Sequence, residues 1–127
     1  MKTASQITSV TNASVRDIEN WVGRLELSTP YQKTTPGRAR LYSRRNALEI
    51  AFIAAMVRGG ASPARAALLS ARSLREWYVF PAGELDRAIE IDKPDLCALA
   101  GKFGATTLSL VRLKEIVRRV DELYEDD

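Results

Sequence analysis

The sequence predicts a mainly α-helical fold with small β elements, in which a helix-turn-helix and a short hairpin precede a smaller α+β segment. Three observations lead to this prediction. Helix-capping residues mark two short helices near the N-terminus, a Pro-Gly pair separates two short basic stretches, and the second half changes from helical to alternating apolar patterning. We therefore expect two units, residues 1–75 and residues 76–127.

The first two helices, residues 3–12 and 14–24, are predicted from their caps. Thr3 and Gln6 have the spacing of a capping box, and Ser14 with Asp17 opens the second helix in the same way. Asn12 tolerates the left-handed backbone of the tight turn between them. At 100° per residue, the apolar side of the second helix holds Val15, Ile18, Val22 and Leu25, and its polar side holds Arg16, Asp17, Asn20 and Arg24. One side is expected to face a core and the other a partner.

A short basic hairpin is predicted next, because Pro30 ends the helical pattern and Pro36-Gly37 suits a type II turn. The arms would be residues 31–35 and 38–42, and they carry Lys33, Arg38 and Arg40. So small a hairpin must lean on the helices, with Leu41 and Tyr42 as its expected anchors.

Two further helices follow the hairpin. Ser43 caps a helix that should run to about Arg58 and end at Gly59-Gly60, and apolar residues cover nearly its whole circumference, so it should be buried on more than one side. Ser62-Pro63 then opens an alanine-rich helix to about residue 74, with Leu68 and Leu69 as its bulky contacts.

In the second half, the sequence pattern predicts strands at residues 76–80, 88–91 and 106–111 and helices at residues 94–103 and 112–124. The last helix has one apolar stripe, made of Leu113, Ile116, Val117, Val120 and Leu123. Because so small an α+β segment cannot bury all its apolar surface alone, we expect it to be a dimerisation module that could also hold an effector. The alternative is that it packs back on the helices of its own chain.

The charge is divided between the two halves. Residues 1–75 hold 12 Lys and Arg against 4 Asp and Glu, a net of +8, whereas residues 76–127 hold 7 against 12, a net of −5. A basic half suits a polyanion such as nucleic acid, although basic residues can also simply solvate a surface.

Composition argues against an enzyme. The chain has no histidine, one cysteine and no Gly-rich phosphate loop, so we expect no catalytic residues, no metal site and no cofactor. No apolar run is long enough to cross a bilayer, so a cytoplasmic, nucleoid-associated protein without a membrane partner is expected.

The order of elements resembles the winged-helix DNA-binding domain of the MerR family of bacterial transcription regulators, over about residues 4–72. The resemblance is carried by the helix opening Ser14-Val15-Arg16, the hairpin end Arg40-Leu41-Tyr42-Ser43, and Gly59-Gly60-Ala61-Ser62 opening another helix. It implies a recognition helix in the major groove and a basic wing on the backbone or minor groove. Trp21 lies where the family has an aromatic residue that touches the DNA backbone, although an equal alternative is that it belongs to the core. Asn12, Asp17, Glu19 and Asn20 depart from the family pattern.

The sequence therefore predicts a regulator that binds a palindromic operator on double-stranded DNA as a homodimer, with RNA polymerase or another protein as a further partner. The expected DNA-binding residues are Ser14, Arg16, Asp17, Asn20, Trp21, Arg24, Lys33, Arg38, Arg40 and Tyr42. The alternatives are a protein-binding adaptor or antirepressor that uses the acidic second half, and an excisionase-like architectural DNA binder.

Overall fold

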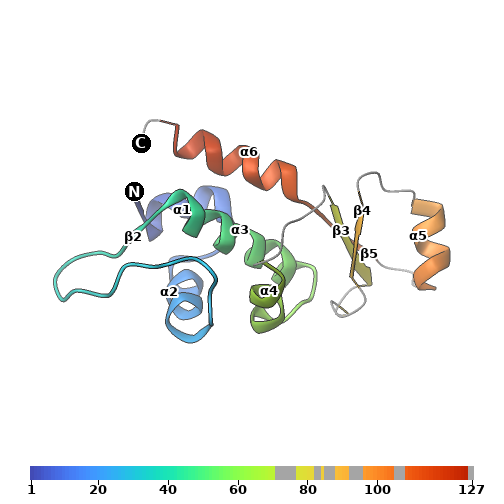
Figure 1. Cartoon of the computed structure of the whole chain (residues 1–127), viewed down its shortest axis with the longest axis horizontal. Helices are drawn as coiled ribbons and strands as arrows, with labels where there is room; N and C mark the ends of the chain where they lie inside the picture. Colours follow the sequence, from blue (N-terminus) through green and yellow to red (C-terminus); the bar gives the residue numbers. More distant parts are fainter. Residues whose placement is uncertain (71–76, 82–83, 85–87, 92–95, 105–107, 126–127) are drawn as a thin grey trace.

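Helices and short strands alternate along an elongated molecule, shown in Figure 1. The computed structural model describes residues 1–70, 77–81, 84, 88–91, 96–104 and 108–125. The elements are β1 (Lys2–Thr3), α1 (Ala4–Thr11), α2 (Val15–Arg24), β2 (Leu41–Tyr42), α3 (Arg44–Arg58), α4 (Pro63–Ser70), β3 (Trp77–Pro81), β4 (Ile89–Ile91), α5 (Leu96–Phe103), β5 (Leu108–Arg112) and α6 (Leu113–Leu123). The predicted boundary between residues 75 and 76 lies outside the described residues.

The caps that predicted the first helices are present. The side chain of Thr3 accepts from the backbone N–H of Gln6, and the side chain of Gln6 accepts from the backbone N–H of Thr3 at 2.8 Å. Asn12 ends α1 in the left-handed conformation, with φ 55°, and the Ser14 hydroxyl caps α2 by accepting from the N–H of Asp17 at 3.0 Å. The turn between α1 and α2 is therefore confirmed.

The core face of α2 is narrower than predicted. Ile18 is fully buried, and Val22 and Leu25 are half-buried against the core. The prediction that Val15 joins them is wrong, since this first residue of the helix is 38% exposed and belongs to neither cluster.

Helix α3 is buried on more than one side, as predicted. Ser43 and Asn46 form its capping box, and the helix is buried on several sides by Ile50, Phe52, Ile53 and Met56. It contributes to two hydrophobic clusters, one shared with α1, α2, β2 and α6 and the other shared with α4, β3, β5 and α6.

Helix α4 starts at Pro63 as expected, with the Ser62 hydroxyl accepting from the N–H of Arg65 at 3.3 Å. Leu69 is half-buried against the cluster around α3 and α4, but the predicted contact Leu68 is 67% exposed and belongs to none of the hydrophobic clusters of the described residues. The last predicted residues of this helix, 71–74, lie outside the described residues.

The second half holds a three-stranded antiparallel sheet in the order β4-β3-β5. In its register Val79 of β3 pairs with Ile89 of β4 and with Leu110 of β5. Phe80 of β3 reaches the cluster around α3 and α4, whereas Val79 packs with Leu99 of α5, so the sheet joins the helices on one side and α5 on the other.

Helix α6 returns to the first half of the chain and lies along α1 and α3 (Figure 1). Its stripe is covered there, since Leu113 and Val120 are buried and Ile116 and Leu123 pack against the clusters. Only Val117 of the stripe remains exposed, at 38%. The stripe therefore packs within the chain, as in the alternative prediction. It no longer supports the expected homodimer, which stays a prediction.

Polar contacts also hold α6 and the following Tyr124 against the first half of the chain. The Tyr124 hydroxyl donates to the carbonyl oxygen of Tyr42 at 2.9 Å in a buried position, Arg119 donates to the carbonyl oxygen of Ser9 at 2.9 Å, and Arg44 forms an ion pair with Asp121. None of the described helices is both long and apolar enough to cross a membrane.

Candidate nucleic-acid interface

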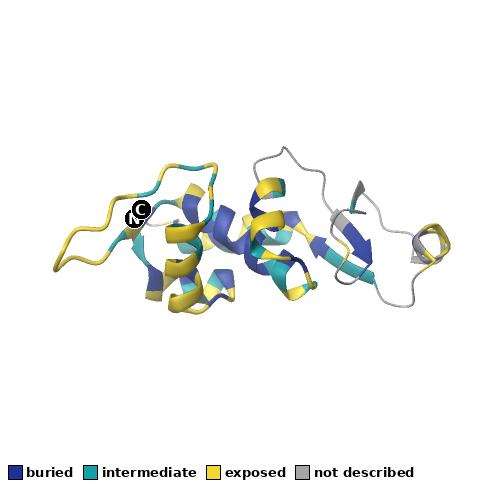
Figure 2. Ribbon diagram, turned by 90° about the horizontal axis from the view of Figure 1, so that it is seen from below, coloured by how far each residue is buried: buried dark blue, intermediate teal, exposed yellow. Residues whose placement is uncertain are grey.

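The outward side of α2 presents polar residues to solvent. Arg16, Asp17, Asn20 and Arg24 are all exposed, opposite the buried Ile18. Figure 2 looks onto this helix from outside and shows its exposed surface, with the loop to β2 extending beyond it. The structure therefore brings together the α2 residues that the sequence predicted as a partner surface.

Four cations of α2 and the loop that follows it form no internal ion pair in the part of the chain that the structure describes. Among the described residues, Arg16, Arg24, Lys33 and Arg38 have no ion pair with a carboxylate. Arg and Lys side chains in this state can exchange their hydration for phosphate oxygens or base edges without first breaking an internal contact.

The loop between α2 and β2 differs from the predicted hairpin. The turn is present, because Gly37 has φ +78° and the N–H of Arg38 donates to the carbonyl oxygen of Thr35 at 3.1 Å. Beyond this one bridge, the described arms are not paired with each other. Instead, residues Leu41–Tyr42 pair with Lys2–Thr3 of β1. The prediction of two paired arms was wrong because the N-terminal segment supplies the backbone partner of the second arm.

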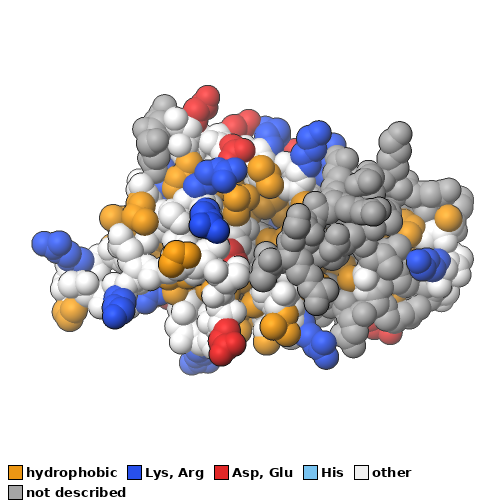
Figure 3. Space-filling model, viewed as in Figure 1, with side chains coloured by type: hydrophobic (Ala, Val, Ile, Leu, Met, Phe, Trp, Pro, Cys, Tyr) orange, Lys and Arg blue, Asp and Glu red, His pale blue; other side chains and the backbone are white. Residues whose placement is uncertain are grey.

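Three cations lie on this loop. Lys33 and Arg38 are exposed, and Figure 3 shows Lys and Arg side chains projecting from this end of the molecule. Arg40 is only half-exposed: it donates to the Thr34 hydroxyl, and its Nε atom is buried without a partner among the described residues. The loop tip is therefore better placed than Arg40 to reach a ligand.

Tyr42 does not belong to the exposed surface. Its side chain is 1% exposed and packs in the core beside Tyr31, with ring centroids 6.2 Å apart and an edge-on angle of 73°. Burial raises the pKa of Tyr42, and the nearby Arg40 guanidinium opposes that shift. The expectation that Tyr42 contacts DNA is wrong because its ring anchors β2, the role predicted for it as a hairpin anchor.

Trp21 and Ser14 have internal roles as well. Trp21 is half-buried and packs against both hydrophobic clusters, so most of its ring serves the core. Ser14 is exposed, but its hydroxyl oxygen is the cap of α2. Both residues fix the position of α2 before any ligand binds.

Sequence reasoning missed a polar cluster in which the buried Asn46 and Glu49 bind Ser28, Thr29 and Tyr31 of the segment after α2. Glu49 of α3 is 4% exposed, and its Oε2 atom accepts from the N–H and the hydroxyl of Ser28, both at 2.7 Å. Its Oε1 atom accepts from the N–H of Thr29 at 3.3 Å, the hydroxyl of Thr29 at 2.6 Å and the hydroxyl of Tyr31 at 2.8 Å. The available signal was Glu49 as the one charged residue in the run from Ala47 to Val57, together with the hydroxyl residues Ser28-Thr29.

The side chain of Asn46 extends the polar cluster toward Pro30. Its amide nitrogen donates to the Thr29 hydroxyl and to the carbonyl oxygen of Pro30, both at 3.0 Å. Burial acts to raise the pKa of Glu49, but the hydrogen bonds from Thr29, Ser28 and Tyr31 outweigh it and hold that pKa below its ordinary value. Burial raises the pKa of the Tyr31 hydroxyl. Glu49 is therefore an anion, and Tyr31 is a neutral donor, at neutral pH.

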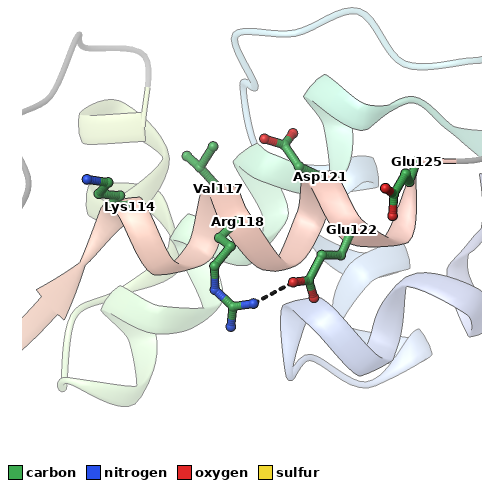
Figure 4. Close-up of a pocket in the computed structure, with 6 residues that line it drawn as sticks. All are labelled: Lys114, Val117, Arg118, Asp121, Glu122 and Glu125. Carbon is green, nitrogen blue, oxygen red and sulfur yellow. Dashed lines mark hydrogen bonds and ion pairs between the residues drawn. The ribbon is translucent and has the colours of Figure 1, made fainter.

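The outer face of α6 carries a second, different surface. A shallow groove along it is lined by Lys114, Val117, Arg118, Asp121, Glu122 and Glu125, and Figure 4 shows these side chains on the one helix. Arg118 donates to Glu115 at 3.0 Å and to Glu122 at 2.5 Å, and its hydrogen bond holds the pKa of Glu115 below the ordinary value. Charges here pair along the helix, unlike those of α2.

Comparison of the chain with protein-family models, with curated proteins and with solved structures found no match. The resemblance to the MerR family therefore stays a prediction made from the residues.

Proposed function

We propose that this chain is a double-stranded DNA-binding transcription regulator of the MerR winged-helix type. The observation that carries the proposal is the outward side of α2, where Arg16, Asn20 and Arg24 are exposed and the two arginines have no ion pair among the described residues. Beside it extends a loop with the cations Lys33, Arg38 and Arg40.

The spacing of these residues suits a major groove. At 1.5 Å rise per residue, Arg16 and Arg24 are about 12 Å apart along the helix axis, a length comparable to the width of the groove. Arginine reads guanine through two hydrogen bonds, and asparagine reads adenine in the same way. Asp17, on the same side, can accept a hydrogen bond from the cytosine amino group. This helix could therefore distinguish base pairs.

The loop cations have a different role in this proposal. Lysine and arginine on a loop reach phosphate oxygens, which fixes the register of the protein on the duplex without reading its sequence. Binding through such contacts releases counterions and therefore weakens as the salt concentration rises.

We further propose that the regulator binds as a homodimer. The argument is that two symmetrical copies on half-sites one helical turn apart double the phosphate contacts. Because the stripe of α6 is covered within the chain, the dimer contact must use other surfaces. Sedimentation of the chain alone and with a palindromic duplex tests this, and a monomer in both cases contradicts it.

Selection of bound sites from random duplex DNA, followed by a salt titration on the selected site, tests DNA binding. Arg16→Ala should weaken binding to the selected site about tenfold and relax the preference at one base pair. Arg38→Ala should weaken binding to all sequences and lower the salt slope by about one. Lys114→Ala removes the same charge from α6 and should change neither, since this residue lies on another face.

A wild-type chain that binds no duplex at low salt overturns the proposal. In that outcome the adaptor alternative, in which the second half holds a protein partner, would be favoured. In the α6 groove, Asp121 and Glu122 are already paired with Arg44 and Arg118, so a basic partner would have to compete with these ion pairs.

A further inference from the structure

We infer that Glu49 is a positioning residue for DNA binding, which anchors the loop between α2 and β2 so that its cations are held beside the recognition surface. The inference rests on the proposed function. Glu49 itself is buried and does not reach a ligand.

The loop needs an anchor because it has little structure of its own. Its described arms share one bridge, at Thr35 and Arg38, and residues 32–39 are exposed. Hydrogen bonds inside the loop join Arg40 to Thr34 and Leu41 to Gln32, but among the described residues none holds the side chain of Lys33 or Arg38. Their position must therefore come from the two ends of the loop.

Both ends of this loop are held by contacts with the rest of the chain, and the two sets of contacts lie next to each other. The incoming end, residues 28–31, is bonded to Glu49 by two backbone N–H groups and three hydroxyls, and the outgoing end pairs with β1 at Leu41–Tyr42. The Tyr31 ring, whose hydroxyl donates to Glu49, packs edge-on against Tyr42. The N–H of Leu41 also donates to the side chain of Gln32 at 3.2 Å. Glu49 thus joins the start of the loop to α3 at the point where the end of the loop returns.

The groups that hydrogen-bond to Glu49 require a carboxylate at this position. All five groups from residues 28–31 are donors, and an ionised carboxylate is a pure acceptor with two oxygens. A glutamine has nearly the same shape, but it replaces one acceptor oxygen by an amino group that would face donors. Glu49→Gln should therefore release one side of the loop start while keeping the volume of the side chain.

The direction in which Glu49→Gln changes the affinity for DNA distinguishes anchoring of the loop from a direct effect of the lost negative charge. Removing a negative charge near a DNA surface should by itself strengthen binding, because DNA is a polyanion. Anchoring predicts the opposite, since a released loop loses phosphate contacts. The sign of the change in affinity therefore decides between the two.

The first measurement uses trypsin on the full chain without DNA. Cleavage after Lys33 and Arg38 should be at least several-fold faster in Glu49→Gln than in the wild type. Glu26→Gln is the matched control, because Glu26 is exposed two residues before Ser28 and makes no contact with the polar cluster among the described residues. Its cleavage rate should equal that of the wild type.

The second measurement is DNA affinity on a duplex selected with the wild type. Glu49→Gln should bind about tenfold more weakly, with a salt slope lower by about two, corresponding to lost contacts from Lys33 and Arg38. Glu26→Gln should bind as well as the wild type or slightly better. Tyr31→Phe removes one donor without changing the charge and should shift cleavage and affinity in the same direction by a smaller factor, even where Glu49→Gln is poorly folded.

The outcomes separate the two proposals. Wild-type cleavage rates in both Glu49→Gln and Tyr31→Phe, or tighter DNA binding by Glu49→Gln with an unchanged salt slope, overturn the inference. A wild type that binds no duplex overturns the proposed function, and faster cleavage of Glu49→Gln then still supports anchoring of the loop by Glu49.

Discussion

Close packing explains one glycine of this chain, Gly59, and does not explain two others, Gly23 and Gly101. A Cβ atom added at Gly59 would lie 2.7 Å from the Phe80 ring, so the end of α3 can approach β3 only without a side chain. Gly23 in α2 and Gly101 in α5 have no atom of the described chain within 4 Å of such a Cβ. These two helical glycines cost backbone entropy without any visible packing reason.

Gly23→Ala and Gly101→Ala should therefore each raise the free energy of unfolding by about 0.5–1 kcal/mol. Gly59→Ala should lower it by about 1–3 kcal/mol, because the new methyl group overpacks the contact with Phe80. Chemical denaturation of the three variants checks the contrast, and a destabilised Gly23→Ala would show that α2 is packed differently.

A hydrogen bond of one hydroxyl group connects α6 to β2. The Tyr124 hydroxyl is the hydrogen-bond donor to the buried carbonyl oxygen of Tyr42. Tyr124→Phe should cost about 1 kcal/mol of stability, because it removes this bond and leaves the carbonyl without that donor. Amide hydrogen exchange near Tyr42 should speed up at the same time, and unchanged exchange there would contradict the coupling of α6 to β2.

At the level of elements, the polar cluster predicts a pH dependence. The pKa of Glu49 in the folded chain is below its ordinary value of 4.5, so its contribution to stability is present above that value and is lost as the pH falls through the lowered pKa. The difference in unfolding free energy between the wild type and Glu49→Gln should thus shrink in acid. Denaturation curves measured from neutral pH to below pH 4 check this, and a difference that grows in acid would contradict it.

Helix boundaries could be predicted because they depend on neighbouring residues. Thr3 with Gln6, Ser14 with Asp17, and Ser43 each satisfy N–H groups only a few positions away, so their role is visible in the local sequence. The same holds for the positive φ of Asn12.

The loop arms could not be predicted in the same way. Whether residues 38–42 pair with 31–35 or with the N-terminal segment depends on which strand is near in space, and both have extended, suitable sequences. Leu68 shows the same limit, because an apolar residue in a short alanine-rich helix is buried only if a neighbouring element covers it.

For the candidate site, sequence reasoning found what is exposed and missed what supports it. Arg16, Asn20 and Arg24 follow from helical periodicity, and the structure places them on one exposed side of α2. The partners of Glu49 are separated from it by 18–21 positions along the chain, so no periodic pattern links them. For Tyr42 the sequence predicts both a hairpin anchor and a DNA contact, and only the packing, in which the residue is 1% exposed, decides between them.

At the scale of the whole molecule, the two halves share their hydrophobic clusters. Val120 and Tyr124 belong to the cluster around α1 and α3, and Phe80, Val111 and Leu113 belong to the cluster around α3 and α4. Helix α3 thus depends on residues from both halves of the chain.

A chain cut after residue 75 should therefore lose most of its stability. Each buried side chain of this size contributes about 1.5–3 kcal/mol, and a domain has only about 5–15 kcal/mol in total. We expect residues 1–75 alone to show no cooperative thermal transition by circular dichroism, unlike the full chain. A sharp transition in the shortened chain would instead support the predicted division into independent units.

The pairing of β1 with β2 and the return of α6 bring the first and last described residues to the same end of the molecule. Lys2 Nζ lies 6.0 Å from the centre of the Tyr124 ring, and Figure 1 shows the start of α1 below the end of α6. Because the side-chain amide of Gln32 donates to the Met1 sulfur at 3.3 Å, a fluorescent reporter or affinity tag fused before Met1 would emerge next to the loop that carries Lys33 and Arg38. Such a fusion is therefore expected to hinder the proposed contact of this loop with phosphate groups.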